Sequence, residues 1–409
     1  MRVLMLTWEY PPRIVGGIAR HVEELSWALA AQGVEVHVVT CEFPGASPEE
    51  VWNGVHVHRV MPYTPADNFV HWVHQLNAAM RDRAEALLRE WTAGRSPLRG
   101  RREGILLHAH DWVSHFSAAA LKHRFKVPLV ATIHATEYGR NQGIHNDLQR
   151  YINSVEWELC YEAWRVIVCS EFMKREIQHA LQAPGDKIDV IPNGVHAEKF
   201  DFDFPSEEAA SLRAQYCAPE EKLVFFVGRM VREKGAHVLI EALPRVRAQY
   251  HDTKLIVVGG GFRDHLVQLA ESLGVARHVY FTGFVPDDTL LRIYKVIDVA
   301  CFPSLYEPFG IVVLEAMAAG APVVVSNAGG LPEVVEHDVT GTVTYAGDSD
   351  SLAWGIVRVL KDPGHARWMA ENARERVRTV FNWDRIASQT RSVYDRVWAE
   401  YRAADWQGP

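Results

Sequence analysis

Short apolar runs alternate with longer amphipathic segments along almost the whole chain. In the first half, runs rich in β-branched residues predict strands at residues 3–6, 34–39, 55–60, 105–109, 127–133, 166–169 and 188–191. Apolar residues that repeat at the helical period predict helices at residues 18–32, 72–91 and 146–164. Strands separated by helices of this length imply right-handed crossovers and a parallel sheet covered on both faces.

The same alternation begins again in the second half of the chain. Further strands are predicted at residues 223–227, 255–258, 279–281, 299–302, 323–325 and 342–344, with helices between them. The turn at Asn193-Gly194 and the segment up to Pro219 interrupt the pattern. We therefore predict an α/β protein with two doubly wound, Rossmann-like domains at residues 1–192 and 193–380, followed by a helical segment at 381–409.

Length and composition agree with this division and exclude several classes of protein. A chain of 409 residues favours two domains, because single hydrophobic cores stop growing at roughly 250–300 residues. The net charge of −8 argues against nucleic acid as a partner. Five scattered cysteines predict reduced thiols, and no apolar stretch approaches the roughly 18 residues that span a bilayer. The N-terminal apolar run is also too short for a signal peptide, so we expect a cytoplasmic protein with no integral membrane segment.

One segment is unusually basic. Residues 93–103 carry four arginines together with glycine and proline. We interpret this segment as a solvated loop. The alternative is contact with an anionic surface, which leaves peripheral membrane contact open.

Candidate chemistry is expected where parallel strands end, because ligands of such sheets bind beyond the carboxyl ends of the strands. After the first strand, Glu9 and Tyr10 lead to Gly16-Gly17 and then to a helix. Two glycines before a helix allow an anionic group to approach the backbone N–H groups at the positive end of the helix dipole. A plain turn would give the same glycine pair.

Histidines and acids follow two further strands of the first half. His134 and Glu137 come after one strand, and His108, His110 and Asp111 lie at the end of another. A lone histidine in such a place is usually a hydrogen-bonded core residue, but two such strand ends predict a cleft for a hydroxyl-rich ligand. We expect no metal here, because no zinc-like ligand set accompanies the histidines.

The second half carries a sharper signal at its first strand. That strand ends in Gly228-Arg229, and Lys234 follows at the start of a helix. Two cations and a helix dipole at one place suit a diphosphate better than a single carboxylate. The alternative is that Arg229 and Lys234 are ordinary surface charges on a loop.

The next strand meets three glycines at residues 259–261. This resembles half of a dinucleotide fingerprint, but a full G-x-G-x-x-G is missing because Asp264 stands at the last position. A nicotinamide cofactor is therefore disfavoured, and a nicotinamide-dependent dehydrogenase ranks last among the functions considered.

The segment that most strongly indicates a ligand-binding site is residues 304–320. Glu307 lies in a loop after a strand, Pro308 is expected in the first turn of the following helix, and Glu315 lies on that helix. Together with the basic loop upstream, these acids predict a carboxylate for ribose hydroxyls beside N–H donors for phosphates. The Asp pairs at positions 201 and 203 and at 348 and 350 are interpreted as structural, Asp348 as a helix N-cap.

The combined motifs resemble glycosyltransferase family 4. The segments at 228–235, 306–315 and 325–333 are similar to the signatures of that family, and residues 8–17, His134 and residues 191–195 agree with it. The resemblance covers nearly the whole chain. It implies a GT-B fold, in which two Rossmann-like domains face a cleft and the C-terminal helix returns to the N-terminal domain.

The family also implies roles for individual residues. Residues implied in catalysis are Arg229, Lys234, Glu307 and His134. Residues implied in donor binding are Gly16, Gly17, Gly228, Phe309, Gly310, Ile311 and Glu315. On the acceptor side, in the N-terminal domain, the expected residues are Glu9, Tyr10, Asp111 and Glu137. The cations would hold the diphosphate, and Glu315 would take the ribose hydroxyls.

Within the family, residues 108–112 and 131–143 resemble the glycogen/starch-synthase-like branch. This implies a retaining hexosyltransferase that moves glucose from ADP-glucose or UDP-glucose to an α-glucan, with no cofactor and no metal. One position departs from bacterial glycogen synthases of the neighbouring family, which have Lys-x-Gly-Gly where this chain has Ile14. Other members of family 4 use small sugars, sugar phosphates or lipid-linked acceptors, and these alternatives stay open.

Retention of configuration leaves two mechanisms. The acceptor attacks on the face from which the diphosphate leaves, or Glu307 forms a covalent intermediate; we favour front-face attack. Two other classes of protein remain as alternatives. One is a GT-B sugar-nucleotide epimerase, and the other is a non-catalytic carbohydrate-binding protein, suggested by 13 Trp and 13 Tyr.

Overall fold

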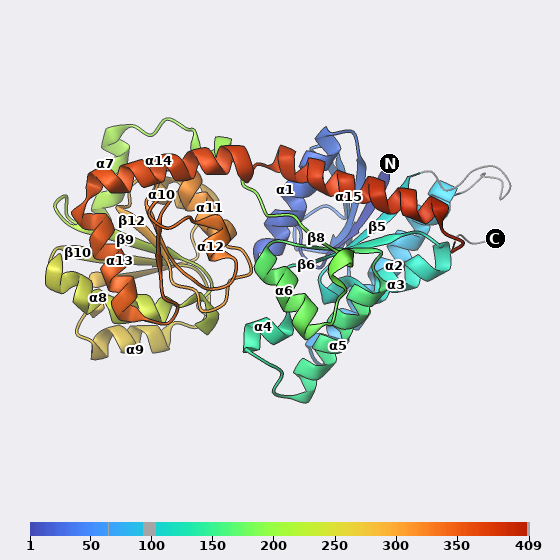
Figure 1. The fold of residues 1–409 in the computed structure, drawn as a ribbon, viewed down its shortest axis with the longest axis horizontal. Helices are drawn as coiled ribbons and strands as arrows, with labels where there is room; N and C mark the ends of the chain where they lie inside the picture. Colours follow the sequence, from blue (N-terminus) through green and yellow to red (C-terminus); the bar gives the residue numbers. More distant parts are fainter. Residues whose placement is uncertain (64, 93–103, 407–409) are drawn as a thin grey trace. The chain divides into compact units, whose positions relative to one another are not determined.

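The structure is a computed structural model that describes residues 1–63, 65–92 and 104–406. The chain divides into two compact units, each built around its own sheet (Figure 1). Unit 1 comprises Met1–Asn193 and Trp383–Pro409, and unit 2 comprises Gly194–Asn382. The arginine-rich segment for which a solvated loop is predicted, residues 93–103, lies outside the described residues.

Unit 1 contains an eight-stranded sheet in the order β3-β4-β2-β1-β5-β6-β7-β8. Its strands are β1 (Arg2–Leu6), β2 (Glu35–Cys41), β3 (Glu49–Trp52), β4 (Val55–Val60), β5 (Ile105–His110), β6 (Leu129–Ile133), β7 (Arg165–Val168) and β8 (Ile188–Val190). All neighbouring strands are parallel except β3, which pairs antiparallel with β4. The strands predicted in this half are confirmed, with ends shifted by a few residues, whereas β3 was not predicted.

The helices of unit 1 cover both faces of its sheet. They are α1 (Gly17–Ala31), α2 (Phe69–Thr92), α3 (His115–Phe125), α4 (Glu137–Asn141), α5 (Asp147–Glu162), α6 (Glu171–Ala180) and α15 (Trp383–Ala403), with short 3₁₀ turns η1 (Trp112–Ser114) and η2 (Gly185–Lys187). Along β1, Val3 and Met5 join the hydrophobic cluster of α1 and α15. Leu4 and Leu6 are also fully buried and point to the opposite face.

The last helix completes unit 1. Figure 1 shows α15 running beside α1. Its first residue, Trp383, donates a hydrogen bond from Nε1 to the buried Glu24 of α1. Further along, the Tyr394 hydroxyl lies 2.7 Å from His108 Nδ1 of β5, and the Tyr401 hydroxyl donates to the Lys126 carbonyl over 2.6 Å. Within the described ranges, no helix is long and apolar enough to cross a membrane.

Unit 2 contains a six-stranded parallel sheet in the order β11-β10-β9-β12-β13-β14. Its strands are β9 (Lys222–Val227), β10 (Thr253–Val258), β11 (Val279–Gly283), β12 (Val299–Phe302), β13 (Val323–Ser326) and β14 (Thr342–Thr344). Its helices are α7 (Ser206–Ala214), α8 (Ala236–Gln249), α9 (Asp264–Ser272), α10 (Asp287–Tyr294), α11 (Ile311–Ala318), α12 (Leu331–Val334), α13 (Ser349–Lys361) and α14 (Pro363–Val380), with 3₁₀ turns η3 (Ala197–Phe200), η4 (Arg232–Lys234) and η5 (Ala276–His278).

Neighbouring residues of β9 show how this sheet is covered on both faces. Phe226 packs in the cluster that contains α8, α9 and α13. Phe225 points to the other face, where its ring lies 5.2 Å from that of Tyr294 of α10. Figure 1 shows α8 and α9 on one side of the strands and α10 and α11 on the other. Six parallel strands with helices on both faces confirm the predicted α/β architecture of this half.

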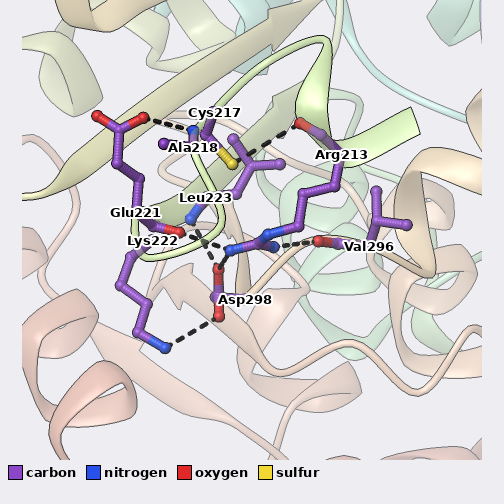
Figure 2. A network of polar contacts seen from close by, with 8 residues as sticks. All are labelled: Arg213, Cys217, Ala218, Glu221, Lys222, Leu223, Val296 and Asp298. Atoms are coloured by element: carbon purple, nitrogen blue, oxygen red, sulfur yellow. Dashed lines mark hydrogen bonds and ion pairs between the residues drawn. The ribbon is translucent and has the colours of Figure 1, made fainter. Parts of the chain in front are cut away.

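A polar network fixes the amino ends of the central strands of unit 2 (Figure 2). Arg213 of α7 donates to the Glu221 carbonyl over 2.7 Å and to Asp298 Oδ2 over 2.6 Å, and it also donates to the Val296 carbonyl. Asp298 in turn accepts from the Leu223 N–H over 2.7 Å. One guanidinium and one carboxylate therefore tie α7, β9 and the segment before β12 together.

In each Asp pair of the second half, the first aspartate has structural partners. Asp348 accepts hydrogen bonds from the N–H groups of Asp350 and Ser351 at the start of α13, which confirms the predicted N-cap. Asp201 forms ion pairs with Arg374 and Arg378 of α14.

A carboxyl group is buried in unit 1 between α5 and α4. Glu156 of α5 is 1% exposed, and its two oxygens accept from the Glu137 N–H over 2.9 and 3.2 Å. Burial raises the pKa of Glu156 to about 8. Because this pKa lies above the ordinary value of about 4.5, the folded state binds the proton more tightly than the unfolded chain. The stabilisation is complete below about pH 4.5 and is lost as the pH rises towards 8.

We predict that Glu156→Gln removes this pH dependence, because a neutral amide keeps a carbonyl acceptor for the Glu137 N–H. The difference in free energy of unfolding, variant minus parent, should increase between about pH 4.5 and 8 by at most about 1.4 kcal/mol per pH unit. Urea unfolding of both proteins at several pH values measures it. The control is Glu90→Gln, an exposed glutamate of the same unit. A constant difference between parent and Glu156→Gln across this range would contradict the prediction.

Candidate functional site

The loops at the carboxyl edge of the unit 2 sheet touch one another through backbone atoms. A Cβ on Gly259 would lie 1.9 Å from the Gly228 carbonyl oxygen, and one on Gly235 would lie 1.9 Å from that of Pro303. A Cβ on Gly329 would lie 2.0 Å from the Glu307 carbonyl oxygen. All of these distances are impossible for a real side chain, so only glycine allows the loops to pack so closely. Gly259, the first of the three glycines at 259–261, therefore has a packing reason that involves no dinucleotide.

An ion pair lies between two of these loops. Lys234 ends η4, and its Nζ lies 2.7 Å from Glu307 Oε2, which also accepts from Ser304 Oγ over 3.2 Å. The Glu307 side chain is 10% exposed, whereas the Lys234 side chain is 24% exposed. The structure thus brings together two of the four residues predicted to act in catalysis. The sequence placed both at the sheet edge but gave no sign that they pair.

Arg229 stands apart from this pair. It follows Gly228 directly after β9, its side chain is 54% exposed, and one guanidinium nitrogen lies 3.5 Å from Glu233 Oε1. Glu233 also holds the next loop through its carbonyl, which accepts from the Leu305 N–H over 2.7 Å. The guanidinium is therefore open to solvent at the edge where β9 ends.

Helix α11 begins later than the sequence suggested. Gly310 has a left-handed conformation with φ 103°, and Ile311 is the first helical residue. Pro308 therefore belongs to the loop and not to the first turn, because the chain must turn at Gly310 before the helix can start. Phe309 is buried, with its ring 5.8 Å from that of Phe381. The first N–H groups of such a helix lack intrahelical partners and can bind an anion.

Glu315 lies inside unit 2 on α11. Its side chain is buried, and its Oε2 accepts from the Tyr294 hydroxyl over 3.2 Å. If Glu315 binds ribose hydroxyls, it does so with one of its oxygens already held by the Tyr294 hydroxyl. Tyr294 was not predicted to contribute, since its helix carries no signal beyond its apolar period.

In unit 1, Glu9 shapes the glycine loop that leads into α1. Its Oε2 accepts from the N–H groups of Val15 and Gly16 over 2.7 and 2.8 Å, and burial raises its pKa. Gly17 is the first residue of α1. Tyr10 lies in the hydrophobic core of the unit, with its hydroxyl 3.4 Å from Ser26 Oγ. Both residues thus support the loop, and this placement gives Tyr10 a packing role.

Several histidine side chains lie close together at the carboxyl ends of β5 and β6. His110 Nδ1 lies 3.1 Å from His134 Nε2, and His108 is hydrogen-bonded at 2.7 Å to both Thr132 and Tyr394. Burial lowers the pKa of His134 to about 3 and holds the pKa values of His108 and His110 well below the ordinary value. These imidazoles are therefore neutral at pH 7, and each can donate one hydrogen bond and accept another.

A further histidine joins this group and was missed in the sequence. His21 of α1 has its ring centroid 4.6 Å from that of His134, and its Nδ1 lies 2.7 Å from Asn193 Oδ1. No strand-end context marks His21, and only the helical period of α1 placed it on the inner face. Ring nitrogens of His21, His110 and His134 lie within 4.8 Å of one another, a spacing that metal ligands can also have. In this arrangement Nδ1 of His110 and Nε2 of His134 are hydrogen-bonded to each other.

Two acids stabilise the backbone on either side of His134, each in a different way. Asp111 has φ 56°, and its Oδ1 accepts from the His134 N–H over 2.7 Å. Burial raises the pKa of Asp111 to about 6. Glu137 opens α4, and its Oε1 accepts from Asn141 Nδ2 over 2.9 Å. Asp111 is therefore a support for the backbone of His134, while Glu137 closes the first turn of its own helix.

The chain is similar over nearly its whole length to known glycosyltransferases. An uncharacterised glycosyltransferase of Methanocaldococcus jannaschii is 41% identical over 96% of this chain and 98% of its own. The glycogen synthase of Mycobacterium tuberculosis is 39% identical over 96% of this chain and 94% of its own. Among solved structures, sucrose-phosphate synthase from Thermosynechococcus elongatus has a TM-score of 0.79 and 27% identity, covering 98% of this chain and 99% of that one.

Two family descriptions match successive parts of the sequence. "Glycosyltransferase Family 4" matches residues 15–199, and "Glycosyl transferases group 1" matches residues 210–376. These ranges coincide with the bulk of unit 1 and of unit 2, and the solved relatives have the GT-B fold. The chain therefore belongs to glycosyltransferase family 4 and is a GT-B enzyme that transfers a sugar from a nucleotide sugar.

Proposed function

We propose that this enzyme elongates an α-glucan by transferring glucose, with retention of configuration, from ADP-glucose or UDP-glucose. The observation that carries the proposal is the Lys234–Glu307 ion pair, held at the sheet edge by backbone contacts that only glycine permits. The 39% identity to a glycogen synthase over nearly the whole chain supports the choice of glucan as acceptor.

The cations of unit 2 would stabilise the departing diphosphate. Lys234 is partly exposed and already oriented by Glu307, and Arg229 offers an exposed guanidinium at the end of the same strand. Positive groups fixed in advance stabilise charge that develops in the transition state without further reorganisation. The N–H groups at the start of α11, around Phe309, Gly310 and Ile311, would bind phosphate and sugar oxygens, and Glu315 would take the ribose hydroxyls.

Glu307 is better suited to hold the sugar than to attack it. One of its oxygens is engaged by Lys234 at 2.7 Å and by Ser304 at 3.2 Å. Electron density drawn towards an ammonium group is less available for a bond to the anomeric carbon. This favours front-face attack, in which the acceptor hydroxyl gives its proton to the departing phosphate oxygen as the new glycosidic bond forms. In unit 1, His134 would offer the sugar a neutral hydrogen-bonding group.

A second candidate is transfer to a sugar phosphate. Arg13 supplies a guanidinium in the glycine loop of unit 1, at 5.5 Å from the Trp72 ring, next to the position where the lysine of bacterial glycogen synthases is replaced by Ile14. A similar solved structure also belongs to a sucrose-phosphate synthase. Product analysis with a maltooligosaccharide and with a hexose phosphate, each offered with ADP- and UDP-glucose, separates the two candidates.

We predict that Lys234→Ala lowers kcat by about 10²–10³-fold while the acceptor KM changes only slightly, because the lost charge acts mainly on the transition state. Steady-state kinetics on the preferred donor and acceptor measure both constants. The matched control is Lys254→Ala, since Lys254 is 25% exposed and also paired with a glutamate, but it lies near the amino end of β10. Equal turnover in Lys234→Ala and parent would remove this lysine from the mechanism.

We also predict that ADP or UDP stabilises the protein more than AMP or UMP does, because the second phosphate is the group that Lys234 would contact. At a hundredfold excess over Kd, a ligand stabilises the folded state by about 2.7 kcal/mol. Thermal unfolding at matched nucleotide concentrations measures the difference. Lys234→Ala should abolish it, and Lys254→Ala should preserve it. Identical shifts for mono- and diphosphates in the parent would refute this assignment.

A further inference from the structure

An aromatic cluster lies in unit 1 and takes no part in the chemistry described so far. The Phe69 and Trp72 rings at the start of α2 are nearly parallel, at 15°, with centroids 5.7 Å apart. Trp8 meets both of them edge-on at 6.1 Å, and Trp112 lies 6.0 Å from Phe69. We call these four residues the aromatic platform.

The platform is only partly buried. Trp112 belongs to a small core cluster against which Trp8 and Trp72 pack, and Phe69 lies outside that cluster. Trp112 is buried, whereas Phe69 at the other end is 50% exposed. Trp8 adds an indole N–H that is buried and has no hydrogen-bond partner within the part of the chain that the structure describes. Buried indole N–H groups usually have a partner. A half-exposed phenyl ring beside an unpartnered donor indicates a surface that is completed by a ligand.

The topology places the platform at the functional edge of the unit 1 sheet. Trp8 follows the end of β1, α2 follows β4, and Trp112 follows the end of β5. These are carboxyl ends of parallel strands, the edge where His134 follows β6 and where Gly17 begins α1. Ligands of parallel sheets bind at this edge.

A positive charge beside the platform indicates which class of ligand would bind there. The Arg13 guanidinium lies 5.9 Å from the Trp8 ring and 5.5 Å from the Trp72 ring, so a cationic donor borders the aromatic faces. Aromatic rings carry negative charge on their faces, which suits the C–H face of a pyranose ring, while a guanidinium suits its hydroxyl or phosphate oxygens. An aliphatic lipid chain would need no such donor.

We propose that the aromatic platform is the acceptor subsite, in which a pyranose ring of the acceptor packs on Phe69 and Trp72 and hydrogen-bonds to Arg13. The proposal rests on the glycosyltransferase function proposed above and specifies its acceptor site. A glucan end and a hexose phosphate share the pyranose ring, so both would use the platform.

The test compares Phe69→Ala and Phe69→Trp with the parent enzyme. Phe69→Ala should raise the acceptor KM about tenfold, equivalent to about 1.4 kcal/mol, and leave the donor KM and kcat within twofold. Phe69→Trp should restore the acceptor KM, because it restores an aromatic face. The control is Trp52→Ala, which removes a 55% exposed aromatic residue of β3 that pairs with Val55 at the amino end of β4. Far-UV circular dichroism verifies that each variant is folded.

Acceptor binding without donor separates this proposal from the proposed function. Tryptophan fluorescence should change when a maltooligosaccharide or a hexose 1-phosphate is titrated into the parent, because Trp8 and Trp72 lie in the platform. Phe69→Ala should weaken the binding of whichever acceptor binds. If the parent turns over no nucleotide sugar, the proposed function fails, while this titration still tests the platform. An unchanged affinity and an unchanged acceptor KM in Phe69→Ala would overturn the acceptor subsite even in an active transferase.

Discussion

Close backbone contact between loops is the constraint on which the unit 2 site depends. Gly235, Gly259 and Gly329 stand where any side chain would collide with a neighbouring carbonyl oxygen. Because these contacts fix the loops after β9, β10, β12 and β13 against one another, Lys234 and Glu307 meet at 2.7 Å without a long flexible reach. The ion pair is thus a consequence of backbone packing, and its geometry is set before any ligand arrives.

The ionisable side chains of the candidate site are buried in unit 1 and partly exposed in unit 2. In unit 1, burial keeps His21, His108, His110 and His134 neutral by lowering their pKa values. In unit 2, the cations of the candidate site, Lys234 and Arg229, are partly exposed and paired with glutamates. Neutral imidazoles suit hydroxyl-rich sugars, which need donors and acceptors in equal measure, whereas ammonium and guanidinium groups suit phosphates. Under the proposed function, each unit would therefore bind a different part of the nucleotide sugar and its acceptor.

The sequence predicted the sheets well because buried parallel strands are continuous apolar runs. It missed β3, whose Glu49 and Glu50 and exposed Trp52 lack that pattern. It placed Lys234 and Glu307 at one sheet edge, but their contact depends on loop packing that no local pattern records. The glycines at 259–261 resembled a ligand motif because the loop contact that requires Gly259 is not visible in the sequence. Tyr10 was placed on the acceptor side because it lies next to the glycine loop, but its side chain belongs to the hydrophobic core. Long-range contacts, and not local propensity, decide these cases.

The return of α15 to unit 1 has a consequence for biosynthesis. Trp383, Tyr394 and Tyr401 cover Glu24, His108 and the end of α3, yet they leave the ribosome only after the whole of unit 2. Unit 2, by contrast, is contiguous and can fold as soon as it emerges. Translation of unit 1 therefore begins before that of unit 2, but unit 1 is completed after unit 2. A nascent chain halted before residue 383 would hold the α1 side of its first sheet open to water, where chaperones and proteases act.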